Sequence, residues 1–219
     1  QRSFALLAEN EQSLLRSLSV FAGGFDLAAV EQVSNWTKGT HQLSLPATLH
    51  ALVSKSLVRS ETLAGDEQRF GLLATIREFA WEQLTASGEA EMLQQRHFAT
   101  YLHFARTVDH KVRGPDAVTW FARLDREHDN LRAAWQWALA TQRFVDAAWL
   151  GVALCHSWHV RAHWYEGAQW LEQLLPQRHQ LAPDLRLALL LTLYRFWRAL
   201  HNFSAVERYG AELTQLRET

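Results

Sequence analysis

The chain has 219 residues, 48% of them hydrophobic and 21% charged, so it can bury a core in one large domain or two small ones. Its formal net charge is −1, and neither half has the clustered basic footprint of a nucleic-acid binder. The single cysteine, Cys155, excludes an internal disulfide framework and a four-cysteine zinc site. It fits a cytoplasmic protein, and no apolar run reaches the length that crossing a bilayer requires.

Three short amphipathic helices are predicted in the first sixty residues. Apolar side chains recur at helical spacing over 9–21, 27–33 and 46–58. The two glycines of "AGGF" (22–25) end the first helix, because glycine adopts backbone conformations that other residues avoid. Asp26 precedes the second helix, where its carboxylate can cap free N–H groups.

A strand-like hairpin follows the third helix. The stretches 57–60 and 68–73 are strand-like, and the Gly-Asp pair at 65–66 predicts the turn between them. A further helix is expected over 75–87. Three short helices followed by a two-stranded ribbon is the order of a winged helix, which we place at residues 1–88.

No strand signal follows, and the rest of the chain predicts a row of helices. They are expected at 89–110, 116–126, 129–141, 144–161, 164–178, 184–201 and 204–217. Residues 158–175 line up with 196–213, and the period is close to that of helical-hairpin repeats, whose neighbours stack to cover apolar faces. The predicted fold is mostly α: a winged helix with a small β-hairpin wing, then a TPR-like helical-hairpin array over 89–219.

Several segments, in this order, carry a family resemblance. They are "FALLAENEQSLLRSLSVFAGGFDLAAVEQV", "LHALVSKSLV", "FGLLATIREFAWEQL" and "LDREHDNLRAAWQWAL". The combination resembles the region that follows the nucleotide-binding module in bacterial signal-transduction ATPases with numerous domains, the STAND class. Within that class it is most similar to predicted-ATPase regulators of the LuxR-type and antibiotic-regulatory transcription factors. The resemblance covers nearly all of residues 3–217.

The resemblance implies a longer parent protein, which fits the unnatural-looking first residues of this chain. In such proteins an ATPase module precedes the winged helix, the helical arm senses an inducer or partner, and a DNA-binding domain lies at one end. The G-x-x-x-x-G-K-[ST] phosphate loop is absent from this sequence. We therefore expect no cofactor here, with ATP or ADP bound by the parent. The implied partners are the parent's own ATPase module and DNA-binding domain, and a small-molecule or protein inducer on the arm.

The same resemblance marks a nucleotide-sensing junction between the wing and the next helix. Related switches carry a Met-His-Asp-like triplet there. The matching residues here are Leu72, Leu73 and Ala74. These side chains offer no polar contact and depart from the family pattern, whereas Arg77 matches it. We expect Arg77 on a helix surface, and Ile76 and Phe79 buried at the junction.

The third helix is the element that would enter a major groove if the winged helix bound DNA. Its cations are Lys55 and, just beyond it, Arg59. Residues 1–90 hold seven Lys or Arg against ten Asp or Glu, and phosphate contacts need several cations. We therefore favour intramolecular packing and expect no direct nucleic-acid binding.

Aromatic and histidine side chains concentrate in the arm. We expect most of its tryptophans to fill seams between stacked hairpins, with one or two on a binding surface. His156, His159 and His163 share a helical stripe that a metal could use, but no acidic residue joins them, so we expect a packed or inter-helix histidine row and no metal site. The predicted interaction surface comprises Trp158, His159, His163 and Trp164.

No group of residues in the sequence indicates a catalytic site. The "EHDN" stretch (127–130) contains acid and base side chains, but Asp129 before an apolar helix is better interpreted as an N-cap. We infer a non-enzymatic regulatory fragment that relays nucleotide- or inducer-dependent switching between an ATPase module and a sensor arm in transcription control. The alternatives are a sequence-specific DNA-binding winged-helix regulator and a helical-repeat scaffold for protein interaction.

Overall fold

The computed structural model places most of the chain in two compact units. It describes residues 4, 6–34, 36, 44–63 and 67–217. Between the second and third predicted helices, the stretch 35–42, which the sequence indicates is a loop, lies outside the described residues apart from Trp36, as does the predicted turn at 65–66. The first unit comprises Gln1–Tyr101 with Arg126–Ala134, and the second Leu102–Asp125 with Trp135–Thr219. The first unit thus continues beyond the boundary we placed at residue 88.

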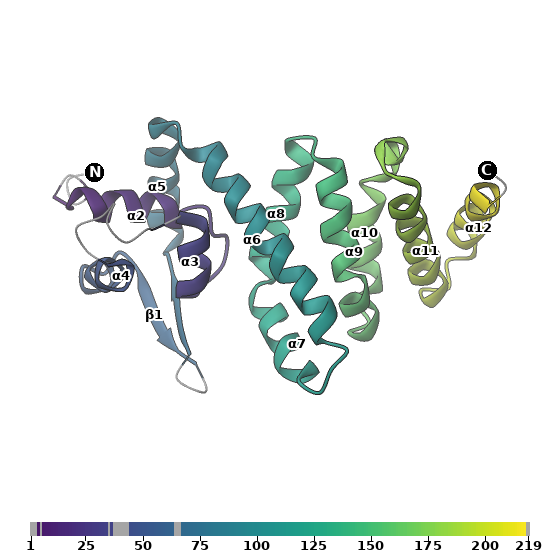
Figure 1. Cartoon of the computed structure of the whole chain (residues 1–219), viewed down its shortest axis with the longest axis horizontal. Coiled ribbons are helices and arrows are strands. Elements are labelled where there is room, and N and C mark those ends of the chain that lie inside the picture. Colours follow the sequence, from purple (N-terminus) through teal and green to yellow (C-terminus); the bar gives the residue numbers. More distant parts are fainter. Residues whose placement is uncertain (1–3, 5, 35, 37–43, 64–66, 218–219) are drawn as a thin grey trace. The chain divides into compact units, whose positions relative to one another are not determined.

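Among the described residues, three helices of the first unit precede its hairpin (Figure 1). They are α2 (Glu9–Leu18), α3 (Leu27–Ser34) and α4 (Leu45–Ser54). Their buried side chains repeat at the helical spacing of the sequence, and include Leu14, Leu15, Leu18, Val30, Val33, Leu49 and Leu52. Asp26 caps α3, because its carboxylate accepts a hydrogen bond of 2.7 Å from the N–H of Ala29. The three predicted helices are confirmed, but α2 ends at Leu18 and α4 at Ser54, earlier than the predicted 21 and 58.

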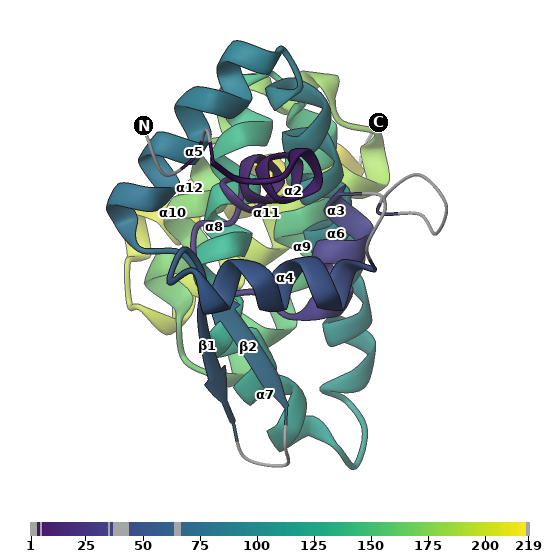
Figure 2. The same cartoon turned by 90° about the vertical axis from the view of Figure 1, so that its left-hand side faces the viewer.

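An antiparallel hairpin follows, and Figure 2 shows α4 lying across its upper end. Its strands are β1 (Arg59–Thr62) and β2 (Gln68–Gly71), with Arg59 opposite Gly71. β1 begins later than the predicted 57–60, because the N–H groups of Leu57 and Val58 turn back to the carbonyl of Leu52 at the end of α4. β2 ends before Leu72, so the predicted strand 68–73 was too long.

The helix α5 (Ala74–Ser87) follows β2 after two residues, so the predicted change from strand to helix is confirmed. Its buried stripe runs through Ala80 and Leu84. Ile76 and Phe79 lie at the margin of this stripe and are only half-buried, so the prediction that both are buried is wrong. Phe79 meets Phe4 edge-on, with the ring centroids 5.4 Å apart.

From residue 90 onward the described chain is helical. The elements are α6 (Ala90–Lys111), α7 (Ala117–Arg126), α8 (His128–Ala140), α9 (Phe144–Val160), α10 (Trp164–Glu172), the 3-10 helix η1 (Leu175–Gln180), α11 (Pro183–Ala199) and α12 (Phe203–Arg217). They match the predicted row, except that the helix predicted over 164–178 stops at Glu172. Pro176 lacks the N–H that would bond to the carbonyl of Glu172. None of the described helices combines the length and apolar character needed to cross a bilayer.

Three turns between these helices share one conformation. Their central residues Gln142, Ala162 and His201 have φ values of 59°, 56° and 58°. The next residue in each turn donates its N–H to the carbonyl five positions earlier, in the bonds Arg143 to Ala138, His163 to Trp158 and Asn202 to Trp197. This is Schellman-type closure of a helix end. Ala162 and His201 are one residue further apart than our alignment of 158–175 with 196–213 predicts, so that alignment was shifted by one at the turn.

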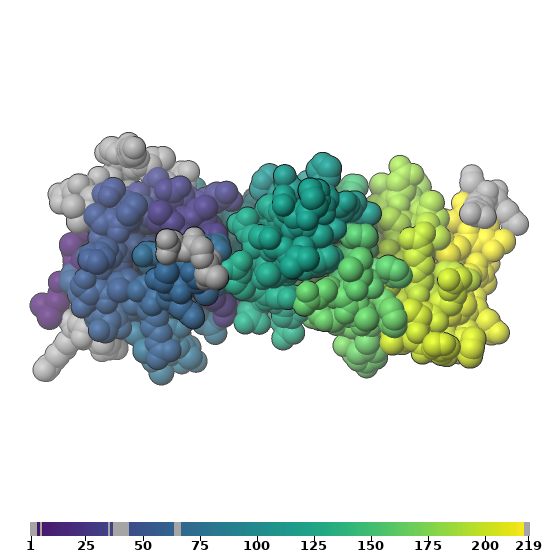
Figure 3. Space-filling view, turned by 90° about the horizontal axis from the view of Figure 1, so that it is seen from below, coloured from purple at the N-terminus to yellow at the C-terminus, as the bar shows by residue number. Residues whose placement is uncertain are grey.

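Wide aromatic rings fill the seams between the helices of the second unit, which follow one another in sequence order from teal to yellow (Figure 3). Trp170 of α10 lies 5.2 Å from Trp135 and 5.4 Å from Trp158, measured between ring centroids. All three are buried, and Phe196 of α11 meets Trp158 edge-on at 6.5 Å. The chain is thus mostly α, a winged helix with a two-stranded wing followed by a TPR-like helical array.

Candidate functional site

The backbone turn "AGGF" between α2 and α3 is held by the side chain of Asn130. Its Oδ1 accepts hydrogen bonds of 3.0 and 3.3 Å from the N–H groups of Ala22 and Gly23. Its Nδ2 donates to the carbonyl of Gly24 at 2.8 Å. Asn130 is fully buried on α8, so one amide satisfies three polar groups of a turn more than a hundred positions earlier in the chain.

Glycine is required in this turn because other side chains pass close to the backbone. A Cβ on Gly24 would lie 2.6 Å from Nε of Arg69 and 3.1 Å from the carbonyl oxygen of Phe70. Phe70 also exchanges two backbone hydrogen bonds of 2.8 Å with Phe25. The wing therefore packs directly on the turn, and only glycine leaves room for Arg69.

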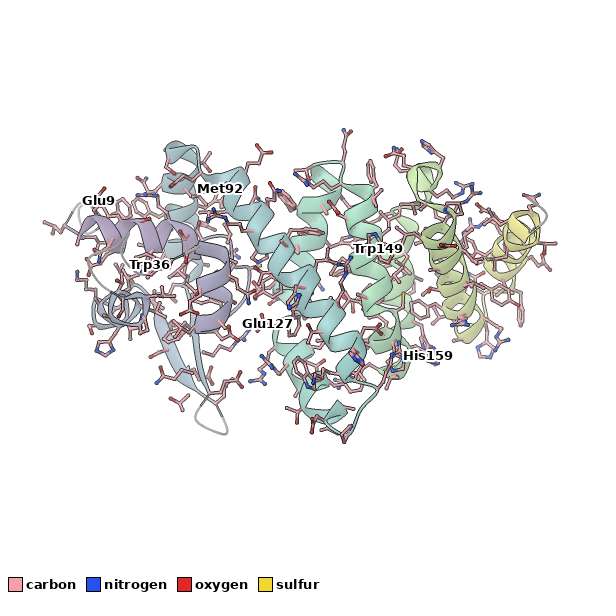
Figure 4. All side chains as sticks on the ribbon, viewed as in Figure 1. Glu9, Trp36, Met92, Glu127, Trp149 and His159 are labelled. Atoms are coloured by element: carbon pink, nitrogen blue, oxygen red, sulfur yellow. The ribbon has the colours of Figure 1, made fainter. Side chains whose placement is uncertain are left out.

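Glu127, just before α8, is the centre of a buried charged network (Figure 4). Its carboxylate forms an ion pair with Arg69 of β2 and accepts hydrogen bonds of 2.8 Å from the Tyr101 hydroxyl and 2.9 Å from Asn130 Nδ2. Arg69 also donates to the carbonyls of Gly24 at 2.7 Å and Arg126 at 2.8 Å. Because every partner belongs to the first unit, the network joins the turn, the wing, α6 and the start of α8 within one compact body.

The electrostatics keep Arg69 and Tyr101 each in one protonation state near neutral pH. Burial alone would lower the pKa of Arg69, but the hydrogen bond and charge of Glu127 outweigh it, and the pKa is raised. Burial, together with the charge of Glu127, raises the pKa of Tyr101 well above its ordinary value. Arg69 therefore stays a cation and Tyr101 a neutral hydrogen-bond donor.

His97 of α6 packs beside the network as a neutral aromatic ring. Its ring centroid lies 4.6 Å from that of Tyr101 and 5.4 Å from that of Phe21. Burial lowers the pKa of His97 to about 4, against a smaller opposing effect of Asn130. Within the described part of the chain its Nε2 has no hydrogen-bond partner, so the ring acts through packing.

The predicted nucleotide-sensing residues lie next to this network. Arg77 is half-buried and donates a hydrogen bond of 3.2 Å to the carbonyl of Ala22, so it touches the same turn. Leu72 is half-buried, whereas Leu73 and Ala74 are exposed where α5 begins. The structure brings Arg77 to the "AGGF" turn, and the contact of these residues with a nucleotide module stays a prediction.

The basic residue at the end of the third helix of the winged domain is already in an ion pair. Lys55, at the end of α4, contacts both carboxylate oxygens of Glu11, at 2.5 and 2.6 Å. The hydrogen bond from Lys55 is the largest cause of the lowered pKa of Glu11, and burial opposes it. A groove of about 790 Å³ beside α4 is lined by the acids Asp26 and Glu67 as well as by His50 and apolar side chains.

The predicted interaction surface in the arm is divided by the structure. Trp158 is buried, 5% exposed, so it belongs to the core of the array. His159 and His163 are exposed, and Trp164 is half-buried with its indole N–H donating to the carbonyl of His159 at 3.2 Å. No group of three His, Cys, Asp or Glu side chains that could hold a metal occurs among the described residues.

Sequence reasoning missed the network because it weighed the "EHDN" stretch only for acid-base chemistry, for a helix cap and for a family resemblance, and assigned no role to Asn130. Asp129 was expected to be the N-cap of its helix. Instead α8 begins at His128, Asp129 is exposed in the first turn, and the carbonyl of Glu127 accepts the N–H of Leu131. The available signal was the joint occurrence of "AGGF", "RFGLL" and "EHDNLRAA", the three segments that supply the network.

Comparison with known proteins identifies the domain type of the first unit. Residues 7–85 match the model of the winged helix-turn-helix domain family. This match agrees with three helices followed by a two-stranded wing, so the chain contains a winged helix-turn-helix domain.

The relatives are longer proteins from mycobacteria. The chain is 38% identical over 182 residues to a Mycobacterium bovis protein whose name assigns it provisionally to the HTH-type transcriptional regulators, and equally to one of Mycobacterium tuberculosis. The match covers 82% of this chain and 20% of each relative. An uncharacterized Mycobacterium bovis protein is 36% identical over 97 residues, 44% of this chain and 24% of that protein. This chain thus spans about a fifth of the length of the curated relatives it matches first.

One solved structure also matches. It is the crystal structure of a STAND protein with a tetratricopeptide repeat sensor from Pyrococcus horikoshii. The TM-score is 0.43 with 17% sequence identity, over 99% of this chain and 33% of that one.

Proposed function

We propose that this chain is the relay segment of a cytoplasmic, multidomain transcription regulator, in which the winged helix packs against other parts of the parent protein instead of reading DNA. The observation that carries this proposal is the ion pair between Glu11 and Lys55, which lies at the end of the third helix. Lys55 is held by both oxygens of Glu11, and the carboxylate neutralises the charge that would attract a phosphate. The neighbouring groove adds the carboxylates of Asp26 and Glu67, which repel a phosphate backbone.

The buried network supports a relay role because it makes the winged helix and the start of the arm one rigid element. Arg69 and Asn130 fix the "AGGF" turn, and Glu127 joins them. The helices α6 and α8 then continue without a break into the second unit. A structural element with a fixed geometry can transmit a conformational change from one site to another. Coupling between sites requires such an element.

Nucleotide chemistry is assigned in this proposal to the ATPase module of the parent, with ATP or ADP bound there. Among the predicted sensing residues, Leu72, Leu73 and Ala74 supply no polar group. Arg77 would reach a neighbouring module by exchanging its 3.2 Å bond to the Ala22 carbonyl for a new acceptor. The loss of the Arg77 bond would then be felt by the "AGGF" turn. Asn130 and Arg69 bind the same turn, so the effect would reach the buried network.

DNA binding by the chain itself tests this proposal. In a fluorescence anisotropy titration at ~150 mM salt we expect weak binding without sequence preference. Glu11→Gln removes the charge that holds Lys55 and should raise non-specific affinity, with a salt slope steeper by about one phosphate contact. Glu9→Gln removes an equal charge from an exposed position of the same helix and should leave the slope unchanged. Tight, site-specific binding by the unmodified chain would overturn the packing role.

DNA reading by α4 is the second candidate, and the names of the mycobacterial relatives favour it. The side of α4 away from the core exposes His50 and Ser54, and Arg59 is exposed at the start of β1. In that case His50→Ala and Arg59→Ala should each reduce affinity for a preferred duplex. Arg113→Ala, an exposed arginine of the second unit, should leave that affinity unchanged.

A further inference from the structure

A cavity of about 640 Å³ lies in the second unit, between α9 and α11 and beside the end of α6. The helices α9 and α11 are the first members of two successive hairpins and pack on each other. Apolar side chains line part of the cavity, among them the buried ring of Phe196 and the half-buried Val152. Its size is that of a pocket for a small organic molecule.

The charged side chains that line this cavity carry a net positive charge, because arginines outnumber the single carboxylate. Its basic and imidazole side chains are Arg113, Arg195, Arg198, His156, His159 and His201. The one carboxylate is that of Asp109, and it is already engaged by Arg113 at 2.7 Å. Arg195 and Arg198 form no ion pair with any described residue, which leaves two guanidinium groups uncompensated at the rim.

Arg195 and Arg198 are three residues apart on α11, a spacing that places their side chains on neighbouring positions of one helix face. A guanidinium group presents a planar fork of N–H donors that matches a carboxylate or a phosphate. Cys155, which also lines the cavity, is neutral: burial raises the pKa of its thiol to about 12, and its Sγ donates to the carbonyl of Gly151 at 3.2 Å. The chemistry of the cavity is therefore recognition of an anion and not attack by a thiolate.

We propose that this cavity binds a small organic anion, whose carboxylate or phosphate group is held by Arg195 and Arg198 and whose apolar part rests on Phe196 and Val152. His159 lies at the exposed end of α9 in this lining (Figure 4) and contributes an imidazole to the same rim. Because the lining comes from two successive hairpins, a bound anion bridges α9 and α11. The site is independent of the relay function proposed above, and the two can fail separately.

Titration calorimetry of the whole chain with three simple anions tests the site. Phenyl phosphate and benzoate distinguish a phosphate head group from a carboxylate, and inorganic phosphate lacks an apolar part. At ~150 mM salt we expect saturable binding of phenyl phosphate, benzoate or both. If phenyl phosphate is bound, it should bind several-fold more tightly than inorganic phosphate. An equal affinity for phenyl phosphate and inorganic phosphate would overturn the apolar contact, and no saturable binding of any of the three would overturn the site.

Matched double variants separate the site from general attraction of anions. Arg195→Gln with Arg198→Gln should weaken binding at least tenfold. Arg106→Gln with Arg123→Gln removes the same charge from arginines of the second unit that lie outside the cavity, over the rings of Trp149 and Trp120, and should leave affinity within twofold. Thermal melting of each variant confirms that it is folded. An equal loss in both double variants would show attraction by net charge alone and overturn the proposal.

Discussion

In the winged-helix unit the packing between elements centres on the buried charges of Glu127 and Arg69, whereas in the helical array it centres on the rings of Trp135, Trp158 and Trp170. Charged hydrogen bonds are directional, and a buried partner left alone is costly. Ring packing depends mainly on volume and tolerates changes that conserve it. The first unit is therefore fixed in one geometry by its polar partners, and the second by how closely its helices approach.

Removing the centre of the polar network should have the largest effect. Glu127→Ala leaves the guanidinium of Arg69 buried without its carboxylate, and we expect a loss of about 3–5 kcal/mol in the free energy of unfolding. Urea denaturation measures this loss. Glu61→Ala, on the exposed strand β1, is the control and should change stability by less than about 0.5 kcal/mol. A loss at Glu127 no larger than at Glu61 would mean that the network does not hold the first unit.

An added methyl group tests the close approach of helices in the array. A Cβ on Gly167 of α10 would lie 2.6 Å from the ring of Phe196 and 2.8 Å from that of Trp158. Gly167→Ala should therefore destabilise by about 1–3 kcal/mol through overpacking. At Gly210 of α12 the nearest atom, on the ring of Tyr194, would be 3.7 Å away, so Gly210→Ala should stabilise by up to about 1 kcal/mol. If the two variants changed the melting temperature equally, ring packing would not be what limits how closely the helices approach.

The smallest expected effect is the pH dependence that His97 gives to the first unit. The unfolded chain takes up a proton at His97 near pH 6.5, but the folded chain does so only near pH 4, because burial lowers the pKa of His97. Between these values the unfolded state binds more protons, so stability falls as pH falls, by at most about 1.4 kcal/mol per pH unit. Above pH 6.5 both states are neutral and this contribution vanishes.

His97→Phe keeps an aromatic ring in place and removes the titration. The difference in unfolding free energy between the variant and the parent chain, measured from pH 7 to pH 5, should move by about 1 kcal/mol or more in favour of the variant. His103→Phe, at an exposed position of the same helix α6, should show no such change. If the difference in unfolding free energy between His97→Phe and the parent chain stayed constant across this range, His97 would have to be exposed to solvent.

Most of the secondary structure could be predicted because its signals are local. The apolar spacing of the helices and the cap at Asp26 each act over a few residues, and the structure has them where the sequence places them. The glycines of "AGGF" were expected to end the first helix, but α2 already ends at Leu18. Errors arose where tertiary contacts decide. Ile76 and Phe79 have helical spacing, yet the inward stripe of α5 runs through Ala80 and Leu84.

The candidate site was beyond the same reasoning, because its partners are far apart in sequence. Glu127 lies in what looked like a short acid-base stretch, and nothing local indicates that Glu127 pairs with Arg69 or that Asn130 binds the turn at 22–24. The anion cavity likewise collects its lining from α6, α9 and α11.

By itself the sequence determined the winged-helix order, the row of helices and the aromatic content of the array, since hydrophobic period and turn chemistry are properties of neighbouring residues. Only the tertiary structure decided which polar groups meet. A hydrogen bond or ion pair depends on distances of about 3 Å between groups that chain folding brings together, and no local pattern encodes those distances. For that reason the sequence indicates that Lys55 is a free cation, whereas in the structure it is the partner of Glu11.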